Sequence, residues 1–93
     1  MEEEFEKIAS DFLVPLRMRE GLDENKYLAL CDALHNLRDK LSNNDTITKS
    51  LALLLIDIYP QMQGIASLYS DVEAEKIQDW AEDLIELIHE VVT

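Results

Sequence analysis

The chain has 93 residues, of which 47% are hydrophobic and 30% are charged. A chain of this length can bury one apolar core and not two, so we expect a single globular domain over residues 1–93. Twenty acidic residues against eight basic ones give a net charge of −12, which disfavours direct binding to nucleic acid or anionic lipid. With two glycines, two prolines and one cysteine, the composition argues against a turn-rich β fold, an internal disulfide and a Cys-x-x-Cys site.

Neither the N-terminal residues nor the apolar runs of the sequence indicate export or insertion into a membrane. The first residues, MEEEFEK, are acidic where a signal peptide is basic. The longest strongly apolar run covers residues 51–56 and stops at Asp57, far short of a membrane span. The sequence therefore predicts a cytoplasmic protein that does not cross a membrane.

The first half of the chain predicts two amphipathic helices. In the first, over residues 2–19, apolar side chains recur at three- and four-residue steps, and Pro15 should bend or end the helix. Gly21 then interrupts the chain, and Asp23 is a suitable N-cap for a second helix over residues 24–41. The apolar positions are Phe5, Ile8, Phe12 and Leu16 in the first helix, and Tyr27, Leu30, Leu34, Leu37 and Leu41 in the second.

A third helix is predicted over residues 46–69, capped by Asp45 or Thr46. Its first half is apolar on nearly every side, as expected for a helix that packs on more than one neighbour. Pro60 should cause a kink in this helix, and Gly64 should mark local fraying.

The last predicted helix covers residues 71–92 and follows the capping-box pattern Ser-Asp-Val-Glu at 70–73. Its apolar stripe consists of Ile77, Trp80, Leu84, Leu87, Ile88 and Val91. Short connections between four helices favour neighbours that run in opposite directions. We therefore expect an all-α fold, an antiparallel up-and-down four-helix bundle.

Two histidines each follow a carboxylate by three residues, which is the spacing of a bundle metal site. The pairs are Asp32 with His35, and Glu86 with His89. At 100° per residue, Asp32 points away from the leucine seam and His35 lies on its flank, while the second pair falls opposite the apolar stripe. Ligands that point into water from separate helices cannot share an ion inside the bundle, so we expect no metal and no cofactor.

His35 also offers a phosphotransfer alternative. The segment His-Asn-Leu-Arg-Asp at 35–39 resembles the His-x-Leu-Lys/Arg core of histidine phosphotransfer domains, and Arg38 would offset the charge of a phosphate on His35. Asp39 stands where those domains have a glycine. Apart from this alternative phosphoacceptor, no phosphate-binding loop or catalytic triad is present, and Cys31 lies beside the seam as a small core residue. The sequence does not predict an enzyme.

The fourth predicted helix is strongly acidic. Like charges at three- and four-residue spacing oppose helix formation, so a face that keeps them is a candidate for binding a cationic partner. The alternatives are an acidic face that is simply solvated, and a small inhibitor or antitoxin-like protein whose acidic face mimics nucleic acid. The candidate partner-binding residues are Asp79, Glu82, Asp83, Glu86 and Glu90.

A family resemblance gives these features a concrete setting. The run YLALCDALHNLRDKL at 27–41 is followed by a polar turn, a long apolar helix and LYSDVEAE at 68–75. From about residue 22 to residue 90, this arrangement resembles the pediocin-like (class IIa) bacteriocin immunity proteins. The resemblance implies a cytosolic antiparallel four-helix bundle that gives self-protection. Such proteins recognise a bacteriocin-occupied sugar permease at the inner membrane face, and their C-terminal half sets the specificity.

Two apolar residues of the third predicted helix lie off its main seam. Leu53 and Ile56 could cover a homodimer contact or pack beneath the first helix.

Overall fold

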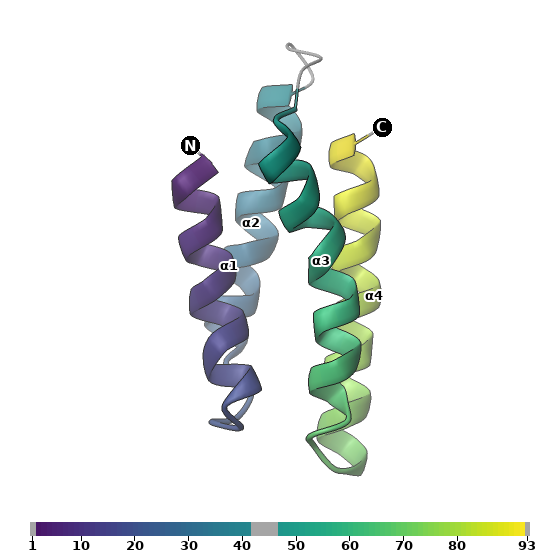
Figure 1. Ribbon diagram of the computed structural model, residues 1–93. Coiled ribbons are helices and arrows are strands. Elements are labelled where there is room, and N and C mark those ends of the chain that lie inside the picture. The colour runs from purple at the N-terminus through teal and green to yellow at the C-terminus, as the bar shows by residue number, and fades with distance from the viewer. Residues whose placement is uncertain (1, 42–46, 93) are drawn as a thin grey trace.

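Four helices make up most of the computed structural model, which describes residues 2–41 and 47–92. They are α1 (Glu2–Arg17), α2 (Glu24–Leu41), α3 (Lys49–Ala66) and α4 (Asp71–Val92). Successive helices run in opposite directions, so both termini lie at the same end of the bundle (Figure 1). The predicted all-α four-helix bundle is confirmed. Within the described ranges, none of these helices has an apolar stretch long enough to span a bilayer.

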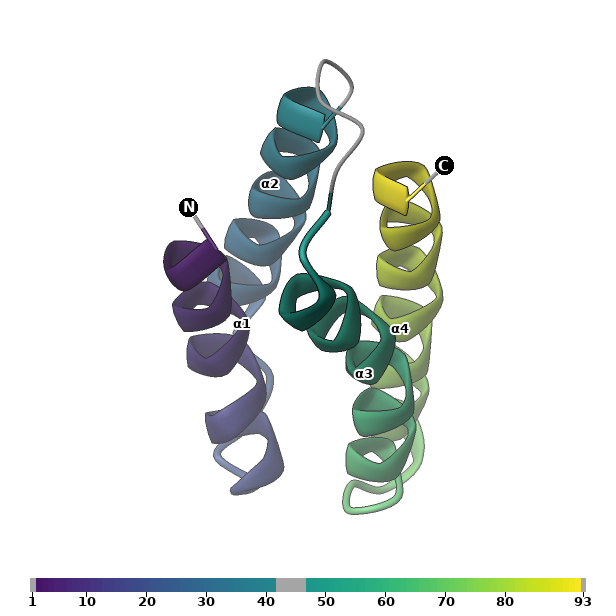
Figure 2. The ribbon, with the colours of Figure 1, turned by 45° about the horizontal axis from the view of Figure 1, so that its top comes forward.

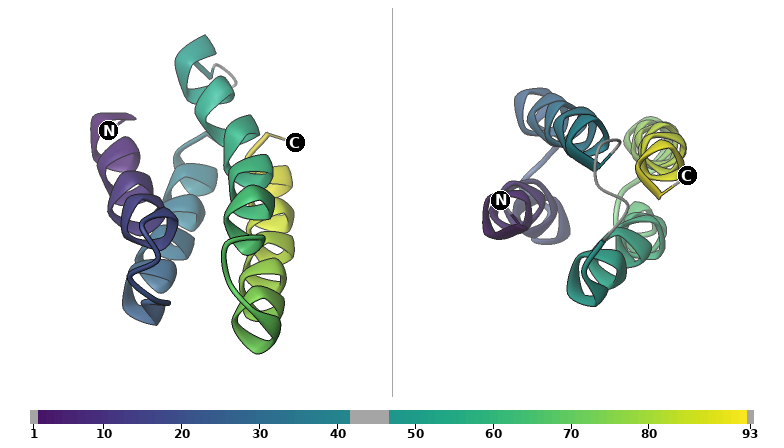
Figure 3. Two further views of the ribbon diagram at one scale, coloured as in Figure 1. Left: turned by 60° about the horizontal axis from the view of Figure 1, so that its bottom comes forward. Right: turned by 90° about the horizontal axis from the view of Figure 1, so that it is seen from above.

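Consecutive helices are neighbours in space within each half of the chain, but α2 and α3 are not. α1 packs against α2 and α3, and α4 packs against the same two helices, whereas α2 and α3 do not approach each other over the residues described. Seen along the bundle axis, α2 lies diagonally across from α3 (Figure 3). The view in Figure 2 shows α3 in front, between α1 and α4. The bundle is therefore two antiparallel helical hairpins, and it is this arrangement that places α4 beside α2.

The helix boundaries follow local capping chemistry. Asp23 accepts a hydrogen bond from the backbone N–H of Lys26 (3.2 Å), so the predicted cap of α2 is confirmed. The backbone N–H of Leu51 donates to the hydroxyl of Thr48 (3.2 Å), which makes Thr48 the N-cap of α3. The caps predicted for α3 at 45–46 lie outside the described residues, and the predicted start at residue 46 is wrong because the helix begins after Thr48.

The helices continue past both prolines and past Gly64. α1 continues two residues past Pro15 to Arg17, and ends before the predicted residue 19. α3 continues through Pro60 and Gly64 and ends at Ala66, three residues before its predicted end. Gly64 lies inside the helix, two residues before its end.

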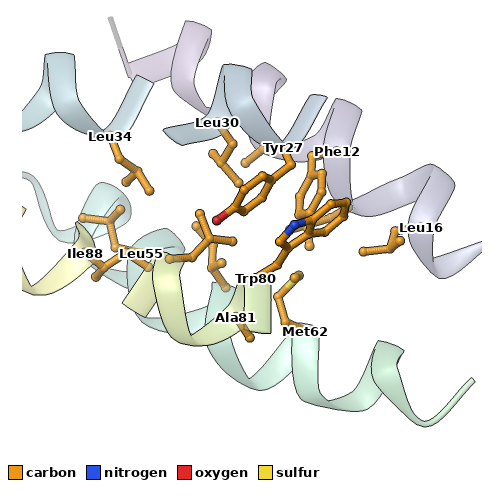
Figure 4. Close-up of a cluster of buried hydrophobic side chains, with 14 of the residues drawn as sticks. Phe12, Leu16, Tyr27, Leu30, Leu34, Leu55, Met62, Trp80, Ala81 and Ile88 are labelled. Carbon is orange, nitrogen blue, oxygen red and sulfur yellow. The ribbon is translucent and has the colours of Figure 1, made fainter. Parts of the chain in front are cut away.

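The core is apolar throughout, and no polar or charged residue of the described chain is buried in it. All four helices contribute side chains to this core (Figure 4). Of the predicted apolar positions, Ile8, Leu41 and Leu87 are only half-buried, and Leu53 and Ile56 of α3 are exposed. At one level of the core, three aromatic rings from α1, α2 and α4 meet: Phe12, Tyr27 and Trp80.

Tyr69 joins the two loops at the end of the bundle opposite the termini. Its hydroxyl donates to the carbonyl oxygen of Leu16 (2.8 Å) and accepts from the backbone N–H of Gly21 (3.2 Å). Gly21 has a φ of +107°, a conformation that favours glycine. The side chains of Arg17 and Gln61 form a further hydrogen bond, which joins α1 to α3.

Candidate protein-binding surface

α4 has one buried side and one acidic side. Its buried residues face α2 and α3, and its acids are left on the remaining surface because a carboxylate without a partner is costly to bury. All five acids predicted to form the partner-binding face, residues 79, 82, 83, 86 and 90, are exposed. They do not, however, share one environment, because two of them are engaged by α2.

Asp83 accepts a hydrogen bond from Tyr27. The phenol oxygen of Tyr27 lies 3.3 Å from Oδ2 of Asp83. The tyrosine ring is buried and stacks on Trp80, with 4.5 Å between ring centroids and 7° between planes. A buried tyrosine needs a polar partner for its hydroxyl, and Asp83 supplies it at the surface of the seam between α2 and α4.

The two protic groups of this seam stay protonated at neutral pH. Burial is the largest cause of a raised pKa for the Tyr27 phenol, and its hydrogen bond with Cys31 and the nearby Asp83 carboxylate raise it further. Burial likewise raises the pKa of the half-buried Cys31 thiol, more than the hydrogen bond with Tyr27 lowers it. A protonated thiol is a poor nucleophile. We therefore interpret the contact of Tyr27, Cys31 and Asp83 as one that packs α2 against α4.

Glu90 is engaged by Arg38 of α2, with 2.6 Å between the guanidinium and the carboxylate. Arg38 also lies 3.4 Å from Asp39, and these partners, Glu90 first, raise the pKa of the guanidinium. The ion pair explains how an acid is accommodated near the C-terminus of α4, where the helix dipole disfavours it. The same ion pair engages Arg38, the cation that phosphotransfer would need beside His35. His35 itself is half-buried on α2.

The other three predicted acids belong to a continuous acidic stripe, which we define as Glu75, Asp79, Glu82 and Glu86. Steps of four, three and four residues place these side chains in one row along α4. All are exposed, and among the described residues no hydrogen bond or ion pair engages them. At 1.5 Å per residue the row is roughly 16 Å long. The single lysine of α4, Lys76, lies 5.8 Å from the centre of the Trp80 ring.

Asp32 lies elsewhere, on the rim of a groove between α1 and α2. The groove has a volume of about 300 Å³. Its apolar lining residues are Phe5, Ile8, Ala29, Ala33 and Leu37, and its polar ones are Glu4, Asp32, Asn36 and Lys40. In the described part of the chain, no three His, Cys, Asp or Glu side chains come close enough to hold a metal ion. The two carboxylate–histidine pairs are thus not brought together.

Sequence reasoning missed the roles of Tyr27 and Arg38. Periodicity places Tyr27 in the seam, and a buried tyrosine is expected to have a hydrogen-bond partner. Which acid provides it depends on the helix that lies alongside, which periodicity does not specify.

Comparisons of this chain with protein-family models, with curated proteins and with solved structures find no significant match in any of the three.

Proposed function

We propose that this protein is a non-enzymatic binding module that neutralises or regulates another protein, and that its concrete role is bacteriocin immunity. The observation that carries the proposal is the acidic stripe: four carboxylates in one exposed row that no described residue engages. The four-helix bundle is the fold that the resemblance to class IIa immunity proteins implies, and the stripe lies in the C-terminal half, where that family's specificity resides.

The physical rationale is electrostatic. Neighbouring like charges on a helix cost about 0.2–0.5 kcal/mol per pair, and a lysine- or arginine-bearing partner would relieve this repulsion and associate faster. A net charge of −12 disfavours binding to anionic lipid itself. In this proposal a protein at the inner membrane face, such as a bacteriocin-occupied sugar permease, therefore provides the attraction, and the immunity protein is cytoplasmic and peripheral.

The seam chemistry supports a role without catalysis. The two protic groups of the seam, Tyr27 and Cys31, both have a raised pKa, and burial is the largest cause for each. Neither is poised to act as a base or nucleophile near neutral pH.

A protection assay tests the proposal. The protein is expressed in a bacterial strain that is sensitive to pediocin-like bacteriocins, and survival is compared with that of the empty-vector strain. We expect protection by the native chain and its loss in a stripe variant, Asp79→Lys, Glu82→Lys and Glu86→Lys. Asp83 and Glu90 are left unchanged because they hold α2.

A matched variant controls for net charge. Glu3→Lys, Glu6→Lys and Asp11→Lys produce the same change in charge on exposed positions of α1, a helix diagonal to α4. We expect this control to protect like the native chain, with both variants folded by circular dichroism. Equal protection by the two variants would rule out the stripe as the contact, and a native chain that protects against no member of a bacteriocin panel would rule out the immunity role.

A further inference from the structure

The outer face of α3 is apolar, and the described chain leaves it uncovered. Leu53 and Ile56 are 56% and 64% exposed, and Pro60 is also exposed. Steps of three and four residues place all three on one side of the helix, opposite the buried Leu55 and Ile58. The alternative in which Leu53 and Ile56 pack beneath α1 is therefore wrong, because both side chains point out of the bundle.

The charges on this face are arranged symmetrically about Leu53. α3 contains two charged residues, Lys49 and Asp57, of opposite sign. Each lies four residues from Leu53, one toward each end of the helix, and both are exposed. Lys49, Leu53 and Asp57 thus form one i±4 ridge, the kind of ridge that packs between helices.

We propose that this face of α3 binds a second copy of the same chain, with the two α3 helices antiparallel and a two-fold axis at Leu53. In that register Leu53 packs against Leu53 of the second copy. Lys49 lies opposite Asp57 of the second copy, and the two-fold axis repeats the same ion pair on the other side. Ile56 and Pro60 extend the apolar contact.

The charge distribution favours this face over the faces of α1 and α4 for self-association. α4 carries eight acids and one lysine, and α1 carries five acids and two bases, so copies that met through those helices would repel each other. On α3 the two charges cancel, and the antiparallel register turns them into attraction. The contact leaves the seam between α2 and α4 accessible, because α2 lies diagonally across the bundle from α3 (Figure 3).

One helix face is smaller than the roughly 800 Å² per partner that stable complexes bury. The expected dimer is therefore a weak one that forms as the protein concentration rises. It does not depend on the proposed function, since its evidence lies on another helix.

Sedimentation equilibrium of the full chain tests the dimer. At physiological ionic strength the repulsion between two acidic chains is screened over about 8 Å. The average mass is expected to rise from one chain toward two with increasing concentration. Leu53→Glu should abolish the rise, whereas Val72→Glu, at a 78% exposed apolar position on α4, should leave it unchanged.

A charge exchange tests the register. Lys49→Asp and Asp57→Lys each place like charges opposite one another twice, so each should lower the association constant by about tenfold or more. The double variant restores opposite charges and should recover the dimer. Recovery excludes misfolding as the cause, and an aspartate in the first turn of α3 is itself favourable to the helix.

A native chain that stays monomeric at all concentrations would overturn the proposal. So would a dimer that survives both single reversals, or one that the double variant fails to recover. Cross-linking of the α3 face to a different protein, with no self-association, would also overturn it and assign the face to that partner.

Discussion

The ring of Tyr27 in α2 lies flat on the indole of Trp80 in α4, with 4.5 Å between ring centroids (Figure 4). The ring of Phe12 in α1 packs against both, with its centroid 6.0 Å from that of Tyr27 and 5.7 Å from that of Trp80. Because α1 and α4 are diagonal helices, this cluster joins helices whose backbones do not approach each other. A substitution in this cluster should therefore lower the stability of the whole bundle and not of one helix alone.

Replacing Trp80 by alanine should lower the free energy of unfolding by about 3–5 kcal/mol, since it leaves a large cavity in the core. Denaturation followed by circular dichroism measures the loss. A small domain has only about 5–15 kcal/mol of stability, so Trp80→Phe, which keeps an aromatic ring, provides a milder variant with a smaller loss. Val72→Ala, at an exposed position, should change stability by less than about 0.5 kcal/mol.

Removing the hydroxyl of Tyr27 tests its bond to Asp83. Tyr27→Phe keeps the stacked ring and loses one hydrogen bond, so we expect about 0.5–1.5 kcal/mol of destabilisation. Tyr59→Phe is the matched control, because the hydroxyl of Tyr59 accepts a hydrogen bond from Gln63 of the same helix. Equal losses in the two variants would contradict a special role for the bond between α2 and α4.

Stability should fall at alkaline pH. The raised pKa values of Tyr27 and Cys31 mean that the unfolded chain ionises first, near the ordinary values of 10.0 and 9.0. Stability from both groups is complete below pH 9.0 and is lost as the pH rises further, by at most about 1.4 kcal/mol per pH unit for each proton. Unfolding curves at several pH values measure the slope. Tyr27→Phe and Cys31→Ala should each flatten it, and an unchanged slope in both would contradict the assignment.

Tyr69→Phe should loosen the loop end of the bundle. The change removes one partner from the Leu16 carbonyl and one from the Gly21 amide, and we expect a loss of about 1–3 kcal/mol. Amide hydrogen exchange should show faster exchange at residues 18–23 and little change near the termini. Uniform acceleration across the chain would instead indicate a general loss of packing.

The ion pair between Arg38 and Glu90 should contribute little and depend on salt, because both side chains are exposed. A double-mutant cycle with Arg38→Gln and Glu90→Gln isolates the coupling between them. We expect a small favourable coupling at low ionic strength that disappears when salt is added. Coupling that persists in high salt would show that the pair is shielded from solvent.

The helices themselves are local consequences of the sequence. Leu30, Leu34 and Leu37 recur with the period of an α-helix, so their burial could be predicted, and Asp23 could be recognised as a cap. Helix ends were harder to predict. Several residues near Thr48 are equally suitable caps in sequence, and only the structure identifies Thr48 as the cap of α3. Helical phase likewise predicted that the acids of α4 and Asp32 would be exposed.

The tertiary arrangement decided which exposed acids of α4 are engaged by another helix. The pattern of an amphipathic helix predicts which side is buried but not which neighbour covers that side. α4 could have packed beside α1 with the same apolar residues buried. Because it packs beside α2, Asp83 and Glu90 are engaged, whereas Asp79, Glu82 and Glu86 have no partner within residues 2–41 and 47–92. Periodicity along the chain thus determined the four helices and their buried sides, whereas the packing of α4 on α2, which depends on how side chains far apart in sequence fit together, decided the composition of the candidate site.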